Sequence, residues 1–412
     1  MRLTFLSTVQ ATICGLILFI IIGCSTNGSQ KQGRPYVILV SMDGFRYEYT
    51  QRGITPWLDS IATAGHLEMM RASFPTLTFP NHYTLATGLT PEHHGIVHNQ
   101  FYDAKLDKVY KVGDHEAVYN PNFYGGEPIW VTAEKQGVKT ACMYWVGNQI
   151  AHHNIMPTYN WEWANKPHID RKMRIDTLAH LLSLPANKRP HLLMLYYSDP
   201  DYVGHIHGPE STQTDSMLTH LDQLMGYLYK TVQNHPLHDS IQIIITSDHG
   251  MQTMDTAKII RPKDYLRPQW IKYRLGNVPT LIYAQKGCTD FIVHALKDAP
   301  HVRVWKREDV PARFNYSHNA RIGDVVVLPD LGYQFCNTYH YTCGAHGFDP
   351  FTKEMHVPVW TLGSYMATSH QGLMTQDTLV NVDIYPLICK LLQIKAAPND
   401  GQPSRWKRLL QD

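Results

Sequence analysis

The sequence predicts an α/β fold with a mixed, mostly parallel sheet between helices and an inserted, smaller α+β subdomain. Continuous apolar runs alternate along the chain with segments of helical spacing, which is typical of strands buried on both faces of such a sheet. The strongest strand candidates each end in aspartate, and they span 35–44, 191–201 and 240–250. Ligands bind outside the carboxyl ends of the strands in open α/β sheets, so these acids indicate a site at one edge.

Helix signals separate these strand candidates. Thr55 as N-cap, Pro56 at the first helical position and Gly65 as the stop predict a helix through about Ala64. Further helices are expected over 128–137, 169–184, 214–235 and about 382–394. Strand-like runs are also expected directly after the first of these, over 138–145, and over 356–363.

Between about 252 and 340 proline and glycine become more frequent and the strand candidates become short. We interpret this region as a subdomain inserted into a catalytic domain that spans 35–400, followed by a C-terminal tail at 401–412. The 412 residues are 43% hydrophobic and carry a formal net charge of +2, which suits one large α/β domain or two smaller ones. So balanced a charge gives no sign of electrostatic capture of nucleic acid, and no specific nucleic-acid binding is expected.

The N-terminus has the pattern of a targeting segment. Arg2 precedes an apolar run that is short for a membrane span, which needs roughly 20 apolar residues. The run ends in Ile-Ile-Gly-Cys at 21–24, which resembles a bacterial lipobox. We expect a signal peptide at 1–23, a lipid anchor on Cys24, a polar tether at 24–34 and a place in the cell envelope, on the periplasmic side or the cell surface. An uncleaved signal anchor is the alternative.

Five cysteines remain in such a mature chain, at positions 142, 288, 336, 343 and 389. Because five is odd, at least one should be a free thiol or pair between chains. Cys336 and Cys343 are close enough in sequence to form one local disulfide in an oxidising compartment.

Three carboxylates and three imidazoles lie near predicted strand ends. Mixed oxygen and nitrogen ligands suit Zn²⁺, whereas Mg²⁺ and Ca²⁺ prefer oxygen alone. Six side chains are too many for one tetrahedral ion and fit two, and two metals about 4 Å apart are the usual clamp for displacement at phosphorus. The six residues are Asp43, Asp201, His205, Asp248, His249 and His346.

Thr78 lies in the segment RASFPTLTFPNHYTLATG at 71–88, two residues before Pro80. Pro80 suits the first position of a helix through about Thr87, and a helix N-terminus attracts anions. A threonine hydroxyl is a poor nucleophile unless a zinc ion lowers its pKa. A plain capping role for Thr78 is the alternative, and the same backbone geometry would serve both.

Several motifs, in this order, resemble the nucleotide pyrophosphatase/phosphodiesterase family of the alkaline phosphatase superfamily. They are TFPNHYTLATGLTPEHHGIVHN, PIWVTAEKQG, DPDYVGHIHGP, SDHGM and GAHGFD, and the resemblance runs from about Pro35 to near Asp400. It implies an alkaline-phosphatase-like core and a covalent phosphothreonine intermediate on Thr78, with Asn99 holding a phosphate oxygen. It also implies two zinc ions, one bound by Asp43, Thr78, Asp248 and His249 and the other by Asp201, His205 and His346.

In nucleotide-cleaving members of that family, aromatic side chains sandwich the base. Phe79 and Tyr196 fall at such positions, and Trp163 fills one more loosely. Ordinary core packing is the alternative for Tyr196 and Trp163. Leu77 replaces a lysine that many animal members carry before the nucleophile, which loosens the inference about substrate.

We therefore predict a lipid-anchored, monomeric two-zinc phosphodiesterase that acts on a small nucleotide substrate and releases a nucleoside 5′-monophosphate. A choline-phosphodiester or lysophospholipase C type activity of the same family is the first alternative. A phosphomonoesterase like alkaline phosphatase and a non-catalytic surface lipoprotein are the others. His207 is expected to orient neighbouring ligands, and surface or structural roles are expected for His82, His93, His94 and His98.

Overall fold

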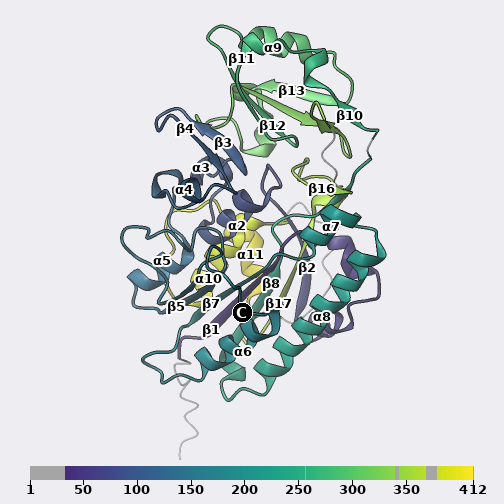
Figure 1. Ribbon diagram of the computed structural model, residues 1–412. Coiled ribbons are helices and arrows are strands. Elements are labelled where there is room, and N and C mark those ends of the chain that lie inside the picture. The colour runs from purple at the N-terminus through teal and green to yellow at the C-terminus, as the bar shows by residue number, and fades with distance from the viewer. Residues whose placement is uncertain (1–32, 256, 339–342, 368–377, 412) are drawn as a thin grey trace, which may run out of the picture. The chain divides into compact units, whose positions relative to one another are not determined.

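The computed structural model describes residues 33–255, 257–338, 343–367 and 378–411 (Figure 1). The predicted signal peptide, Cys24 and most of the tether lie outside these residues, and 34–412 forms one compact unit. None of the helices in the described ranges combines the length and the apolar character that crossing a membrane requires.

An eight-stranded sheet forms the centre of this unit, with the order β18-β2-β17-β8-β1-β7-β5-β6. β17 runs antiparallel to both of its neighbours, and the other pairs are parallel, which confirms the predicted mixed, mostly parallel sheet. The strands are β1 (Tyr36–Met42), β2 (His66–Arg71), β5 (Thr140–Met143), β6 (Tyr159–Trp161), β7 (Leu192–Tyr197), β8 (Ile241–Thr246), β17 (Val357–Leu362) and β18 (Leu379–Val380).

The central strands are apolar along their whole length because both faces are covered. Every residue of β1, β7 and β8 is buried, and Val40 of β1 lies between Leu195 of β7 and Ile245 of β8. The helices form two groups, and within each group they pack against one another. The sheet lies between the two groups (Figure 1). One group is α1 (Pro56–Ala64), α6 (Arg171–Leu182) and α8 (Thr212–Gln233), and the other is α2 (Thr78–Thr87), α5 (Ile129–Lys135) and α10 (Ile384–Leu391).

Two helices differ from expectation at their N-termini, α1 in its capping and α2 in its first residue. α1 begins at Pro56 as predicted, but the Thr55 side chain makes no capping hydrogen bond. Asp222 of α8 accepts from the first backbone N–H groups of α1 instead, at 2.8 and 3.2 Å. α2 begins at Thr78, so Pro80 is its third residue and not its first. Proline is tolerated there because the N–H groups of a first helical turn have no partner inside the helix.

A second, antiparallel sheet lies inside the region predicted as an insertion, in the order β11-β12-β14-β13. Its strands are β11 (Ile271–Leu275), β12 (Thr280–Ala284), β13 (Val302–Lys306) and β14 (Val325–Pro329), and α9 (Thr289–Leu296) packs against β13 and β14. Ile282, Leu296 and Val325 belong to a hydrophobic core separate from that of the main sheet. The boundaries of the insertion at about 252 and 340 stay a prediction.

Further short strand pairs and helices lie outside these two sheets. The paired strands are β3 (Gln100–Asp103) with β4 (Lys108–Lys111), β9 (Gln252–Thr253) with β16 (Gly344–Ala345), and β10 (Ile259–Ile260) with β15 (Gln334–Phe335). The short helices are α3 (Pro91–His94), α4 (His115–Val118), α7 (Asp201–His207) and α11 (Pro403–Trp406). The expected disulfide is absent from the described residues, where Cys336 is buried, Cys343 is exposed and no bond joins the two.

Candidate active site

The carboxyl ends of the three central strands bring the predicted ligands together. β1 lies between β7 and β8, so the segments that follow these strands leave the sheet side by side. Asp43 follows β1 directly, Asp248 follows β8, and Asp201 begins α7 after β7. Asp199, the other acid after β7, forms an ion pair with Arg171 and belongs to neither ligand group described below.

The first set, which we call the buried group, consists of Asp43, Asp248 and His249. His249 Nε2 lies 3.1 Å from Asp248 Oδ2 and 3.4 Å from Asp43 Oδ1. All three side chains are almost completely shielded from solvent. Tyr196 fixes one of them, because its hydroxyl donates to Asp43 Oδ2 at 2.7 Å and leaves Oδ1 facing His249.

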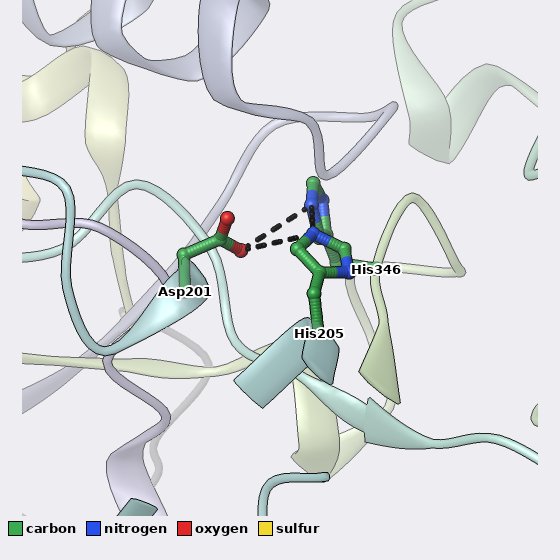
Figure 2. Close-up of side chains that lie close together, drawn as sticks. All are labelled: Asp201, His205 and His346. Carbon is green, nitrogen blue, oxygen red and sulfur yellow. Dashed lines mark hydrogen bonds and ion pairs between the residues drawn. The ribbon is translucent and has the colours of Figure 1, made fainter. Parts of the chain in front are cut away.

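The second set, the half-exposed group, consists of Asp201, His205 and His346 (Figure 2). Asp201 and His205 lie one turn apart on α7, and His346 follows β16. Asp201 Oδ1 lies 3.4 Å from His205 Nε2 and 3.5 Å from His346 Nε2. The rings of His346 and His249 stack with their centroids 3.6 Å apart, so the two groups adjoin each other.

The polar atoms of both groups fit metal cations. Asp43 Oδ1, Asp201 Oδ1 and Asp248 Oδ2 are buried and lack a hydrogen-bond partner among the described residues. Buried carboxylate oxygens are costly unless paired or coordinating a metal.

The histidines of the two groups share one orientation. Nδ1 donates to a backbone carbonyl in each ring: to Gly344 at 2.8 Å from His205, to Thr76 at 2.9 Å from His346 and to Gly250 at 2.9 Å from His249. This arrangement leaves the Nε2 lone pairs free, and those of His205 and His346 face each other at 3.1 Å. Two lone pairs so close repel unless a cation lies by them, and a backbone partner on the other nitrogen is typical of histidine ligands.

Electrostatics supports the same conclusion. Burial, with the charges of Asp248 and Asp201, holds the pKa of Asp43 well above its ordinary value. Burial also raises the pKa of Asp201, although His205 opposes the change. Burial would raise the pKa of Asp248 too, but His249 and His82 outweigh it, so that pKa is lowered. A cation in each group would relieve the repulsion between these carboxylates.

Thr78 is the first residue of α2, and its hydroxyl faces the buried group. Its Oγ1 lies 3.1 Å from His249 Nε2. The helix makes no use of this side chain as a cap, because the capping position belongs to Leu77. Asn99 lies on the same side of the site, where its Oδ1 accepts a hydrogen bond from the Phe79 backbone N–H at 3.1 Å. Its amide NH₂ is therefore the end available to a ligand oxygen.

An apolar pocket of about 450 Å³ opens beside Thr78. The three aromatic residues expected to bind a base, Phe79, Trp163 and Tyr196, all line it. Trp163 is 43% exposed, so its indole ring is not buried in the core, and its ring contacts that of Tyr196 edge to face with the centroids 5.6 Å apart. The remaining lining residues were not predicted from the sequence; they are Val112, Gly113, His115, Val118, Tyr119, Tyr144, Trp145, Val146, Gln149 and Ala164.

His82, for which the sequence indicated no specific role, joins α2 to the buried group. One turn after Thr78, its Nδ1 donates to the Thr78 carbonyl at 3.1 Å and lies 3.1 Å from Asp248 Oδ2. Nε2 faces Ser41 Oγ at 2.9 Å, and the ring is fully buried. The four-residue spacing from Thr78 was the available signal, since it places both residues on one helix face. His207, expected to orient ligands, is exposed at the end of α7, and backbone carbonyls do the orienting.

Comparisons with known proteins agree on one family. The model of the family described as type I phosphodiesterase / nucleotide pyrophosphatase matches residues 37–349. Ectonucleotide pyrophosphatase/phosphodiesterase family member 3 of Mus musculus is 34% identical over 397 residues, which cover 91% of this chain. Member 7 of Rattus norvegicus is 32% identical over 418 residues, which cover 97% of this chain and 93% of that protein. The bis(5′-adenosyl)-triphosphatase enpp4 of Xenopus laevis is 32% identical, with 96% of this chain and 86% of that protein covered.

Solved structures give the same result. Murine ectonucleotide pyrophosphatase/phosphodiesterase 5, in an inactive form in complex with AMP, superposes with a TM-score of 0.84 at 29% identity, covering 92% of this chain and 100% of that chain. The chain spans only 44% of member 3, although it spans most of the member 7 and enpp4 proteins. The family model thus covers this chain from β1 to His346 of the half-exposed group. The chain belongs to the type I phosphodiesterase / nucleotide pyrophosphatase family of the alkaline phosphatase superfamily.

Proposed function

We propose that this protein is a zinc-dependent phosphodiesterase that hydrolyses phosphodiester or pyrophosphate bonds of nucleotides and releases a nucleoside 5′-monophosphate. One observation carries the proposal: an apolar, aromatic-lined pocket opens directly beside a threonine hydroxyl that faces two adjoining groups of metal-type ligands. The AMP bound to the murine relative and the name of the Xenopus relative support a nucleotide as the substrate.

The residues divide the chemistry between them. Zn²⁺ bound at the buried and half-exposed groups would supply positive charge that lowers the pKa of the Thr78 hydroxyl and stabilises the phosphoryl oxygens. The Thr78 hydroxyl gives its proton to solvent and Oγ forms a bond to phosphorus while the bond to the leaving oxygen breaks; that oxygen keeps the electron pair and takes a proton from solvent. Water then attacks phosphorus, the bond between phosphorus and Thr78 Oγ breaks, and Oγ regains a proton as the nucleoside 5′-monophosphate is released. The Asn99 amide donates to a phosphoryl oxygen throughout.

The pocket holds the part of the substrate that stays with phosphorus. Phe79 and Trp163 offer ring surface to a planar base, and stacking of this kind is worth about 1–3 kcal/mol per base and tolerates any base. A phosphocholine head group is smaller and would fill a pocket of about 450 Å³ less completely. The nucleotide is therefore the favoured occupant, with a choline phosphodiester as the alternative.

The proposal also includes the cellular location of the enzyme. A lipid on Cys24 would hold the catalytic unit at the cell envelope, on the periplasmic side or at the surface, as a monomer that acts on small molecules. Labelling with palmitate would test the anchor, since a Cys24→Ser variant should take up no label.

The function is tested by paired rates on soluble protein that begins near Gly33 and is supplied with zinc. Hydrolysis of p-nitrophenyl thymidine 5′-monophosphate is compared with that of p-nitrophenyl phosphorylcholine, and Thr78→Ala is the control. We expect a strong preference for the nucleotide ester that disappears in the variant. A preference for phosphorylcholine would overturn the substrate, and activity on neither ester would overturn the proposed function itself.

A further inference from the structure

We propose that the exposed face of α7 is the leaving-group subsite and that it favours an uncharged, apolar leaving group over a polyphosphate. The inference rests on the function proposed above and narrows its substrate class. The residues that define the subsite are Tyr202 and Ile206, which are among the most exposed large apolar side chains of the described residues.

Helix geometry places these two side chains beside the half-exposed group. Asp201 and His205 lie four residues apart on α7, and so do Tyr202 and Ile206. In an α-helix each such pair forms a stripe along the axis, and stripes one residue apart are neighbours about 100° around it. Tyr202 is 65% exposed and Ile206 is 45% exposed, so an apolar stripe faces solvent next to the stripe that carries the ligands.

The position of Thr78 determines which part of the substrate meets this stripe. Its hydroxyl lies against His249 of the buried group. In an in-line displacement the attacking and leaving oxygens are on opposite sides of phosphorus. With two metal sites, each of these oxygens lies beside one of the two ligand groups. The leaving oxygen is therefore directed to the half-exposed group, and whatever is attached to it passes over α7.

Charge around α7 disfavours a polyphosphate there. α7 has the sequence DYVGHIH, so the helix carries one carboxylate and two histidines but no lysine or arginine.

The arginines that flank α7 are already ion-paired. Arg171 pairs with Asp199, which precedes the helix in the sequence. Arg46 pairs with Glu48 at 2.5 Å and lies 3.8 Å from Glu210, which follows the helix. A pyrophosphate leaving group carries several negative charges and needs free cations, whereas an alkyl or aryl group needs only apolar surface.

The test uses substrates whose leaving groups differ in apolar surface alone. Ethyl and hexyl esters of thymidine 5′-monophosphate release alcohols of nearly equal pKa, so the ratio of their kcat/KM values reports contact with the alkyl chain. We expect the hexyl ester to be favoured about tenfold, the usual effect of a few methylenes entering an apolar site. ATP is the polyphosphate substrate, and because pyrophosphate is a far better leaving group than an alkoxide, its kcat/KM is compared between variants and not with that of the alkyl esters.

Variants assign the preference to α7. Tyr202→Ser together with Ile206→Ser should bring the hexyl-to-ethyl ratio close to one, while Tyr202→Phe should keep it. Ile206→Lys should raise the rate on ATP relative to the hexyl ester. Phe291→Ser, which removes an equally exposed aromatic side chain on α9 of the second sheet region, is the matched control and should leave the ratio unchanged.

Three results would overturn the inference, and each is distinct from failure of the proposed function. Equal rates on the ethyl and hexyl esters would show that no apolar subsite exists, although the enzyme would still be a nucleotide phosphodiesterase. An unchanged rate on ATP relative to the hexyl ester in Ile206→Lys would contradict the charge argument. If the double serine variant kept its ratio but no longer bound phosphatidylglycerol vesicles, the stripe would be a lipid-surface contact. Inactivity on every nucleotide ester would instead reject the proposed function.

Discussion

The buried group and the half-exposed group contain the same kinds of side chains but lie in different surroundings. Asp43 and Asp248 follow two central strands, and His249 follows Asp248, so the backbone that carries them is part of the best-packed region of the sheet. Asp201 and His205 lie instead on α7, a helix of seven residues whose outer face is in solvent. Only His346 of that second group is buried.

This difference indicates a division of labour between rigidity and access. A nucleophile has to be held within a fraction of an ångström of its productive position, which a strand end and a buried helix turn provide. A leaving group has to depart, so the elements around it must be open to solvent. The same contrast predicts that the two groups will respond differently to substitution, chelation and acid.

The largest effect is expected for Thr78→Ala. Loss of the hydroxyl removes the attacking atom, so kcat should fall by about a thousandfold or more, while the melting temperature stays close to that of the parent protein. Thr87→Ala is the matched control, because Thr87 is a buried threonine of the same helix whose hydroxyl faces neither ligand group: it donates to the Tyr83 carbonyl at 2.8 Å and accepts from the Leu89 N–H at 3.3 Å. Similar losses in both variants would mean that Thr78 has only a structural role.

Chelation should separate the two groups by rate. We expect a chelator to remove zinc in two phases, the faster from the half-exposed group, because the His205 side chain is 31% exposed whereas the His249 side chain of the buried group is fully buried. Zinc content measured by mass spectrometry during dialysis would show the phases. His205→Ala should abolish the fast phase and keep one equivalent of zinc, whereas release in a single phase from the parent protein would contradict the contrast.

A smaller effect is expected for Tyr196→Phe, which keeps the ring in the pocket but removes the hydroxyl that holds Asp43. Removal of such an orienting partner typically lowers metal affinity 10- to 100-fold. Competition with a chromophoric chelator would measure this loss, which should fall on the slow phase alone. Tyr197→Phe is the control, since that hydroxyl bonds to the Arg171 carbonyl. Loss of the fast phase instead would show that Tyr196 does not act through the buried group.

The sequence predicted the central sheet, and it indicated that the candidate ligands Asp43, Asp201 and Asp248 meet at one edge, because both depend on local pattern. An apolar run closed by aspartate is visible in the sequence, and parallel strands place their carboxyl ends at one edge. The capping of α1 was not predictable in this way, because its donor groups are satisfied by Asp222, more than 160 residues away.

The contacts that support the site could not be predicted either, because they also join residues far apart in the sequence. Tyr196 was expected to stack on a base, and it does line the pocket, but its hydrogen bond to Asp43 depends on the register between β1 and β7. Trp145 follows a strand end as the aspartates do, so its place in the pocket could have been anticipated. The residues that surround Trp145 in the pocket could not have been anticipated, because they come from four separate segments of the chain.

The smallest predicted effect concerns His94, a buried histidine outside both groups. Its Nδ1 accepts from the Ile96 N–H at 3.1 Å and its Nε2 donates to the Pro80 carbonyl at 3.1 Å, so the ring is neutral. Burial lowers its pKa to about 3, against 6.5 for an ordinary histidine. The unfolded chain therefore takes up the proton first, and the stability that the neutral ring contributes is complete above pH 6.5 and is lost as the pH falls towards 3.

Urea unfolding of the metal-free protein between pH 7.5 and pH 5 would measure this loss. A single such histidine lowers the free energy of unfolding by up to about 1.4 kcal/mol per pH unit below its unfolded pKa. His94→Gln, which keeps a donor for the Pro80 carbonyl, should reduce the slope by that amount. The slope that remains then belongs to other groups whose pKa differs between the folded and the unfolded chain, among them His98 and His152, whose pKa burial lowers to about 4. An unchanged slope would mean that His94 is already protonated, or reached by water, in the folded protein.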